Sequence, residues 1–159
     1  MKMFTLVLLG SLFCHLNVSG QIIEKEVIPN CKATESNFFV SRGKRLLEWN
    51  QEKLTSRSNL SLNDIKELFA PEFIVIANGR KYEANYQNYY EFLNKFRSDI
   101  DTIDYEVQEY LHAEMAVIIP LKVTVKRLQG KQDLFEVMML IKFNDSGKII
   151  HWQEVYHLE

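Results

Sequence analysis

Apolar residues recur with helical spacing in three stretches of the first hundred residues. The first predicted helix runs from Asn37 to Lys53. The stripe along one side of it consists of Phe39, Gly43, Leu46 or Leu47, Asn50 and Leu54, in which Gly43 is small and Asn50 is polar. A glycine inside a helix costs about 1 kcal/mol relative to alanine. Gly43 therefore indicates a place where this helix comes close to the rest of the fold.

Two shorter helices follow. Ser61 precedes Asp64 by three residues, which is the spacing of a cap that satisfies free backbone N–H groups of a first helical turn. Ile65, Leu68 and Phe69 continue with helical spacing, and Pro71 should end this helix. A third helix is predicted from Tyr86 to Phe96, with its aromatic and aliphatic residues stacked on one side.

The rest of the pattern alternates with a period of two, which is typical of strands. The alternating segments are Phe73–Ala77, Ile103–Leu111, Val117–Val125, Phe135–Phe143 and the stretch after Gly147. Asn78-Gly79 and Gln129-Gly130-Lys131 provide turns between them. Helices followed by a meander of long strands predict an α+β fold, in which a curved, mainly antiparallel sheet wraps the N-terminal helices in its concave face.

The first twenty residues have the features of a cleavable signal peptide. Lys2 supplies a positive start, Met3 to Phe13 an apolar run, and Val18-Ser19-Gly20 a small-residue cleavage site. The apolar run is about half the ~20 residues that cross a bilayer, so we expect no stable membrane anchor. The sequence thus predicts a protein exported to the periplasm or the medium, with an arm at 21–35 and one domain at 36–159.

Charge and cysteine content narrow the function classes. Without residues 1–20, 139 of the 159 residues remain, with 18 basic and 21 acidic side chains and a formal charge of −3. This acidity provides no basic field for nucleic acid, and the Lys126-Arg127 pair with Lys131 is read as a solvated hairpin end. Cys31 is then the single cysteine, so it either pairs between chains or stays a free thiol.

Several short motifs carry a family resemblance. The segments Leu68-Phe69-Ala70-Pro71-Glu72-Phe73, Asn78-Gly79-Arg80 and Gly147-Lys148-Ile149, together with the helix from Tyr86, resemble the cone-shaped nuclear transport factor 2-like and SnoaL-like proteins. The resemblance implies a cone with an internal pocket. It also implies a homodimer formed through the outer sheet face, where Ile149 and Val155 are expected as apolar residues. This one fold supports enzymes and binding modules alike, so function has to be argued from the pocket.

Two catalytic positions of the resembling families can be placed on this chain. Ketosteroid isomerase-like members have a base aspartate where this sequence has Ala77, which cannot accept a proton. SnoaL-like cyclases have an acid/base aspartate on the last strand, where this sequence has Glu154. The longer side chain moves the carboxylate by about an ångström, and a shift of that size can cost about a hundredfold in rate.

The candidate pocket residues lie on the last strand and near the third helix. Alternation places Ile150, Trp152, Glu154, Tyr156 and Leu158 on one face, which we expect to line the cone. Tyr82 and Tyr86 are the tyrosines expected to contact a ligand from the other side. Glu154 is either a buried acid/base group with a raised pKa or a carboxylate paired with a lysine at the rim or at a dimer contact.

No metal site is predicted, because His151 and His157 would stand about 20 Å apart along a strand at ~3.3 Å per residue. No cofactor is implied either. Three functions remain open. The first is a module that binds a small hydrophobic molecule. The second is an isomerase, cyclase or dehydratase in which Glu154 is the acid/base group, acting on a small cyclic or polyketide-like substrate. The third is an exported domain that binds a protein partner.

Overall fold

The structure, a computed structural model, describes the chain from residue 31 to residue 159, with side chains from residue 37. The predicted signal peptide, most of the predicted arm and the side chain of Cys31 lie outside the described residues. The helices are α1 (Cys31–Lys53), α2 (Leu62–Leu68), α3 (Tyr86–Phe96) and the short 3₁₀ helix η1 (Arg97–Asp99). The strands are β1 (Phe69–Ala77), β2 (Arg80–Asn85), β3 (Ile100–Val107), β4 (Leu111–Ala113), β5 (Ala116–Arg127), β6 (Gln132–Phe143) and β7 (Ile149–Leu158).

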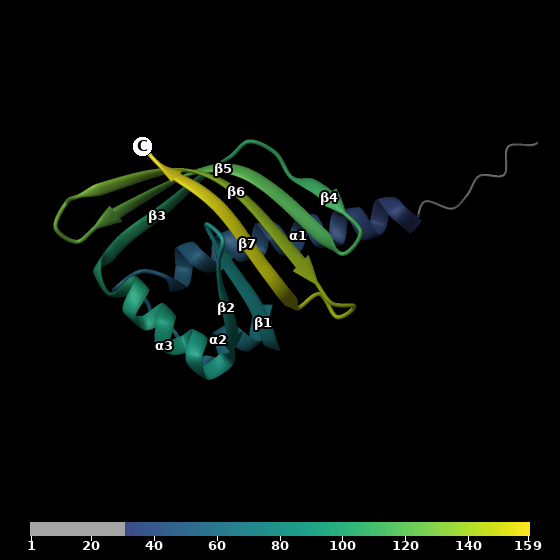
Figure 1. The fold of residues 1–159 in the computed structure, drawn as a ribbon, viewed down its shortest axis with the longest axis horizontal. Coiled ribbons are helices and arrows are strands. Elements are labelled where there is room, and N and C mark those ends of the chain that lie inside the picture. Colours follow the sequence, from purple (N-terminus) through teal and green to yellow (C-terminus); the bar gives the residue numbers. More distant parts are fainter. Residues whose placement is uncertain (1–30) are drawn as a thin grey trace, which may run out of the picture.

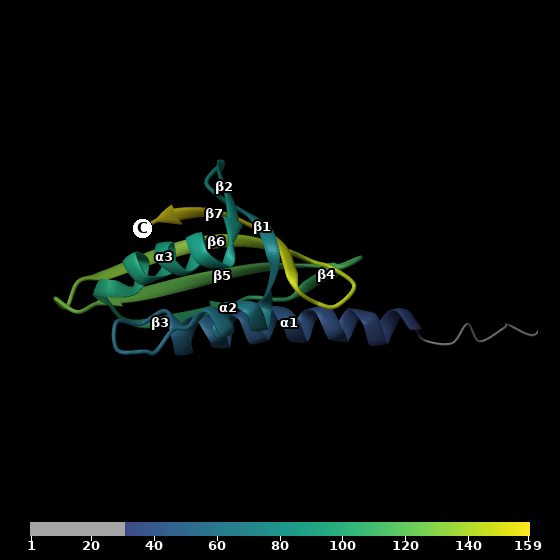
Figure 2. The same cartoon turned by 90° about the horizontal axis from the view of Figure 1, so that it is seen from below.

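The strands form one sheet in the order β2-β1-β7-β6-β5-β3, with β4 paired to β5. All neighbouring strands are antiparallel except β1 and β7, which are parallel. The long strands β5, β6 and β7 curve over α2 and α3, and α1 runs along β3 and β5 (Figure 1 and Figure 2). The expected α+β fold, with helices in the concave face of a curved sheet, is thus confirmed.

The core lies between the helices and the concave side of the sheet. Trp49 of α1 and Phe69 of β1 are fully buried, and their rings meet at a centroid distance of 6.1 Å. Phe69 also contacts the rings of Phe73, Tyr89 and Trp152, at 4.6, 5.1 and 6.3 Å. Because Phe69 touches residues of β1, α3 and β7, it joins the three elements that surround the cavity described below.

The predicted cap at Ser61 is confirmed, and the structure adds a second cap at Asn85. Ser61 and Asp64 form a reciprocal capping box at the start of α2, with Asp64 Oδ2 accepting the Ser61 N–H at 2.7 Å. Asn85 caps α3 in the same way and accepts two backbone N–H groups at 3.0 Å. Gly43 does mark a close approach, because a Cβ at this position would lie 3.0 Å from Cγ1 of Val117 on β5.

Several element boundaries differ from the sequence expectation. Helix α1 begins at Cys31 rather than Asn37, and Phe69 begins strand β1 instead of ending helix α2. The strand expected from Ile103 to Leu111 is divided into β3 and β4, because β5 pairs with each separately. Within residues 31–159, no helix is long and apolar enough to cross a membrane.

The expected faces of the last strand were wrong at its first two residues. Phe143 pairs with Ile149 but Lys142 pairs with His151, so Ile150 is an extra residue that bulges out of β7. As a result Ile149 is 1% exposed in the core and Ile150 is 39% exposed, the reverse of the simple alternation. Ile149 therefore cannot contribute to an outer-face dimer contact, whereas Val155 remains exposed there.

Candidate functional site

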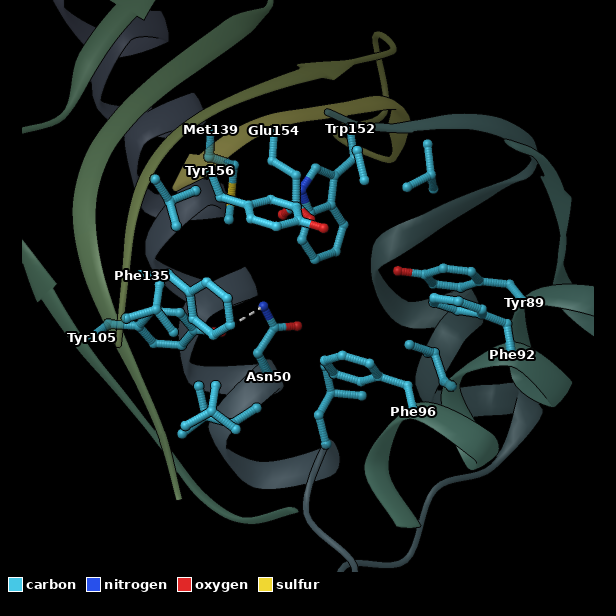
Figure 3. A pocket seen from close by; sticks show the side chains of 18 of the residues that line it. Asn50, Tyr89, Phe92, Phe96, Tyr105, Phe135, Met139, Trp152, Glu154 and Tyr156 are labelled. Carbon is cyan, nitrogen blue, oxygen red and sulfur yellow. Dashed lines mark hydrogen bonds between the residues drawn. The ribbon is translucent and has the colours of Figure 1, made fainter. Parts of the chain in front are cut away.

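A cavity of about 360 Å³ opens between the concave side of the sheet, helix α3 and the C-terminal half of α1 (Figure 3). Aliphatic side chains of β3, β5 and β6 form one wall. The remaining surface is dominated by seven aromatic residues, namely Tyr89, Phe92, Phe96, Tyr105, Phe135, Trp152 and Tyr156. This volume lies within the range of about 300–1,000 Å³ that is usual for pockets that bind small molecules.

Strand β7 places three candidate residues in this cavity. Trp152, Glu154 and Tyr156 alternate along one face of the strand and all point inward, as Figure 3 shows. The turn residue Asn78 fixes this part of β7. Its backbone N–H donates to the carbonyl oxygen of Glu154 at 3.0 Å, and its side-chain amide bonds both the N–H and the carbonyl of Tyr156, at 2.8 and 3.0 Å.

Glu154 has neighbours from two strands. It pairs with Ala77 on β1 and with Met139 on β6, both of which also line the cavity. Among residues 37–159, no lysine, arginine or histidine nitrogen comes within 4.0 Å of its carboxylate. This argues against the rim ion pair that was one of the two expectations for Glu154.

Burial raises the pKa of the Glu154 carboxyl above its ordinary value, because the charged form loses its hydration among apolar walls. The nearby indole N–H of Trp152 opposes this rise in pKa. The two groups do not reach ordinary hydrogen-bond geometry, and Trp152 Nε1 has no partner among the described residues, so the effect of the indole is small. The carboxyl of Glu154 thus keeps its proton to a higher pH than an exposed glutamate.

Asn50 on α1 is the polar residue that the sequence analysis missed. It is 1% exposed, and its side-chain nitrogen donates to the hydroxyl of Tyr105 at 3.1 Å. Its side-chain oxygen has no partner in the described part of the chain and points into the cavity (Figure 3). An unpaired buried polar atom costs about 1–3 kcal/mol. The signal in the sequence was an asparagine within the apolar stripe of the first helix.

The hydroxyls of Tyr89 and Tyr105 are held in the neutral form. Burial is the main cause that raises the pKa of Tyr89 and that of Tyr105, and the nearby Glu154 carboxylate raises both further. The hydroxyl of Tyr89 points into the cavity from α3 (Figure 3). A tyrosine that stays protonated offers both a donor and an acceptor to whatever the cavity holds.

Tyr82 and Tyr86, the two expected ligand-binding tyrosines, do not line this cavity. Tyr82 is on β2, is 36% exposed and stacks near Phe92 at a centroid distance of 5.9 Å. Tyr86 occupies the first turn of α3, and its hydroxyl donates to the carbonyl of Phe69 at 3.3 Å. One helical turn later, Tyr89 takes the inward position that the sequence analysis had given to Tyr86.

Arg127 was read as part of a solvated hairpin end, but its side chain lines the far end of the cavity. Its guanidinium donates to Asp99 and to Asp133, each at 2.9 Å. Asp133 is additionally paired with Lys131 at 2.8 Å. Two basic and two acidic groups thus form a cluster without net charge, which closes the hairpin end of the cavity.

Within the described residues, no three His, Cys, Asp or Glu side chains are close enough together to hold a metal ion. The cavity therefore offers apolar surface, neutral hydroxyl and amide groups, and one acidic group. Such a set can bind a small molecule or exchange one proton with it.

No protein-family model matches the chain, and no curated protein matches it in sequence. Solved structures do match it. A Mycobacterium tuberculosis epoxide hydrolase described as LEH-like superposes with a TM-score of 0.62 at 10% identity, over 77% of this chain and 85% of that protein. A proposed SnoaL-like polyketide cyclase from Jannaschia superposes with a TM-score of 0.60 at 13% identity, over 79% and 88% of the two chains.

A third match is a nuclear transport factor 2-like protein of unknown function from Cytophaga hutchinsonii, with a TM-score of 0.55 at 10% identity over 77% of this chain and 99% of that one. This chain has the nuclear transport factor 2-like fold. The resemblance found in the sequence motifs is thereby confirmed at the level of the fold. Sequence identities of 10–13% establish a shared fold, and a shared fold does not define a ligand or a reaction. The ligand and the chemistry of this cone therefore have to be inferred from its own residues.

Proposed function

We propose that this protein is an exported binding module that holds a small, mainly apolar molecule in the cone cavity. The observation that carries the proposal is the cavity itself, with about 360 Å³ of space and seven aromatic residues in its lining. Ligand pockets are typically of this size, with apolar walls and a few polar groups that fix orientation. Glu154 and Asn50 are the polar groups in that role.

A cavity-filling substitution tests this function. Ala77 lines the cavity beside Glu154, so Ala77→Phe should occupy the space a ligand needs. Ala113 on β4 is exposed and outside the cavity, which makes Ala113→Phe a matched control. The uncharged fluorescent probe N-phenyl-1-naphthylamine should bind the wild type and the control with one saturable site, and Ala77→Phe should weaken it by about tenfold or more. Equal binding by both variants would refute the proposal.

Acid/base catalysis is the second candidate, and Glu154 is the observation that favours it. Its side chain is half-buried in the cavity wall and has no basic partner in residues 37–159, and desolvation raises its pKa, as a general acid/base at neutral pH requires. In this candidate function Tyr89, which lines the cavity, would take the role of polarising a substrate carbonyl in place of Tyr82 or Tyr86. The substrate class would be a small cyclic or polyketide-like molecule.

Carbon-detected NMR titration of the Glu154 side chain tests the catalytic candidate without a known substrate. A pKa at or below the ~4.3 of a free glutamate would exclude it. With a substrate in hand, Glu154→Gln should abolish turnover and keep binding, because the amide preserves shape but cannot shuttle a proton.

Export is the part of the proposal that rests on the sequence alone. The arrangement of Lys2, the apolar run Met3–Phe13 and Val18-Ser19-Gly20 supports it. Protein isolated from its native host should begin at or near Gln21 by N-terminal sequencing. Full-length protein in the cytosolic fraction would contradict export and leave the cavity proposal untouched.

A further inference from the structure

Two polar groups of the cavity, the side-chain amide of Asn50 and the carboxyl of Glu154, have oxygen atoms that can face a ligand. The side-chain oxygen of Asn50 points into the cavity without a partner in the described residues, and the Glu154 carboxylate lies across from it. The indole N–H of Trp152 is the unpaired donor on this side, and it lies next to Glu154 (Figure 3). A ligand that carries a positive charge is attracted by both of these oxygen-bearing groups.

The charge of the cavity is also one-sided. Glu154 is acidic and has no counter-ion among residues 37–159, while Arg127 at the other end is matched by Asp99 and Asp133. Asp133 in turn is shared with Lys131, so the Arg127 cluster adds no net charge. When Glu154 ionises, the cavity carries one uncompensated negative charge, which a cationic ligand would neutralise.

Aromatic rings stand on both sides of that carboxylate. Trp152 and Tyr156 flank Glu154 on the same face of β7, and the Tyr156 ring is held edge-on by Phe135 at a centroid distance of 5.7 Å. Tyr89 faces them from α3 (Figure 3). Rings attract a cation that lies within about 6 Å of their centroids, and protein sites for quaternary ammonium groups are built from such rings.

We propose that the ligand of this cone is an organic amine, whose ammonium group lies between Glu154 and the rings of Trp152 and Tyr156 while its apolar part fills the aliphatic end. The proposal rests on the ligand-binding function above and adds the chemical class of the ligand. A carboxylate with aromatic neighbours selects a cation over a neutral molecule of the same shape, because only the cation gains from both.

Binding of such a cation should depend on pH through one group. The titratable groups facing Glu154 are Tyr89 from α3, Tyr105 from β3 and Tyr156 from β7, with the paired Arg127 from β5 farther away. The residues that α1, β1 and β6 contribute to the lining carry no titratable side chain. Burial raises the pKa of Glu154 in the free protein. A bound cation favours the ionised form, so binding should release a proton and strengthen as pH rises.

An isosteric pair of probes tests the amine assignment. Benzyltrimethylammonium and neopentylbenzene have the same shape and differ by the exchange of a cationic nitrogen for a carbon. Near neutral pH, titration calorimetry of the wild type should show the cation binding about tenfold or more tighter than the hydrocarbon. Calorimetry in buffers of different ionisation enthalpy should show proton release with the cation and none with the hydrocarbon.

Glu154→Gln should bring the two affinities to within about threefold of each other, while Glu72→Gln, on the exposed side of β1, should keep the preference. A cation preference that survives in Glu154→Gln would overturn the amine proposal. The amine proposal would also be overturned if the hydrocarbon bound the wild type as tightly as the cation. That result would still support the proposed function, because an apolar molecule would have bound in the cavity. If neither probe binds while N-phenyl-1-naphthylamine still binds the wild type, the amine proposal fails and the proposed function stands; if that dye does not bind either, both proposals fail. If Glu154→Gln does not fold, the amine proposal is still tested on the wild type, by the affinity difference between the two probes and by proton release on binding of the cation.

Discussion

Replacing Gly43 by alanine tests how closely α1 packs on the sheet. Gly43 is buried in α1, and a Cβ built on it would lie 3.0 Å from Cγ1 of Val117 and 3.3 Å from Cδ1 of Ile119. Alanine gains about 1 kcal/mol over glycine in a helix interior. Overpacking a tight contact costs about 1–3 kcal/mol. In the wild-type background Gly43→Ala should therefore leave stability unchanged or lower it by up to about 2 kcal/mol.

The same substitution should act differently once the nearest methyl groups are gone. In a Val117→Ala background most of the clash disappears, so Gly43→Ala should stabilise the protein by up to about 1 kcal/mol. The coupling between the two positions should be about 1–3 kcal/mol, which is the range of residues in contact. Urea unfolding of the four proteins measures it, and comparing Ser41→Ala with Ser41→Gly at an exposed position of α1 calibrates the helix term. Equal effects of Gly43→Ala in both backgrounds would show that the helix does not contact the sheet as described.

Three further results are expected. Burial raises the pKa of Glu154, so above ~4.3 the native state still holds a proton that the unfolded state has lost. The stability of the wild type should therefore fall by ~1.4 kcal/mol per pH unit between the unfolded-state pKa and the native-state pKa. Glu154→Gln should remove that slope and be the more stable protein at neutral pH, whereas parallel pH profiles from urea melts would contradict it. Asn85→Ala should lose about 1 kcal/mol in the same melts, because two backbone N–H groups at the start of α3 lose their acceptor, and an unchanged midpoint would show that the cap is dispensable. Met138 and Val155 pair across β6 and β7 on the outer sheet face, where they are 50% and 58% exposed. We therefore expect light scattering to show a homodimer with or without reductant, and a monomer for the double variant Met138→Lys, Val155→Lys.

The parts of the fold that could be read from the sequence are those set by local rules. The capping boxes at Ser61 and Asn85 depend on residues three positions apart, and the turn at Gly130 requires a positive φ, which is 81° here. The alternation of β6 depends on one buried face and was predicted correctly, from Phe135 to Phe143. Each of these features is decided within a few residues of chain.

The parts that could not be read depend on partners far away in the sequence. The bulge at Ile150 arises where β7 pairs with both β1 and β6, and nothing near Ile150 indicates it. Tyr86 and Tyr89 are one turn apart on α3, and the sheet decides which of them faces the cavity. Asn50 looked like a member of an apolar stripe, because its role depends on Tyr105, which is 55 residues away.

The pairing of β1 with β7 places Ala77 beside Glu154, because the two residues are neighbours in the parallel register. An acid at position 77 would therefore lie next to the Glu154 carboxyl. Two carboxyl groups side by side would repel each other and drive one pKa still higher. With alanine at this position, Glu154 is the only carboxyl group that residues 37–159 contribute to the lining, and a small space is left beside it. Proton transfer normally needs a second polar group next to the first, whereas a single carboxylate among aromatic rings is enough to hold a cation. The presence of Ala77 beside Glu154 therefore favours binding over catalysis in this cavity.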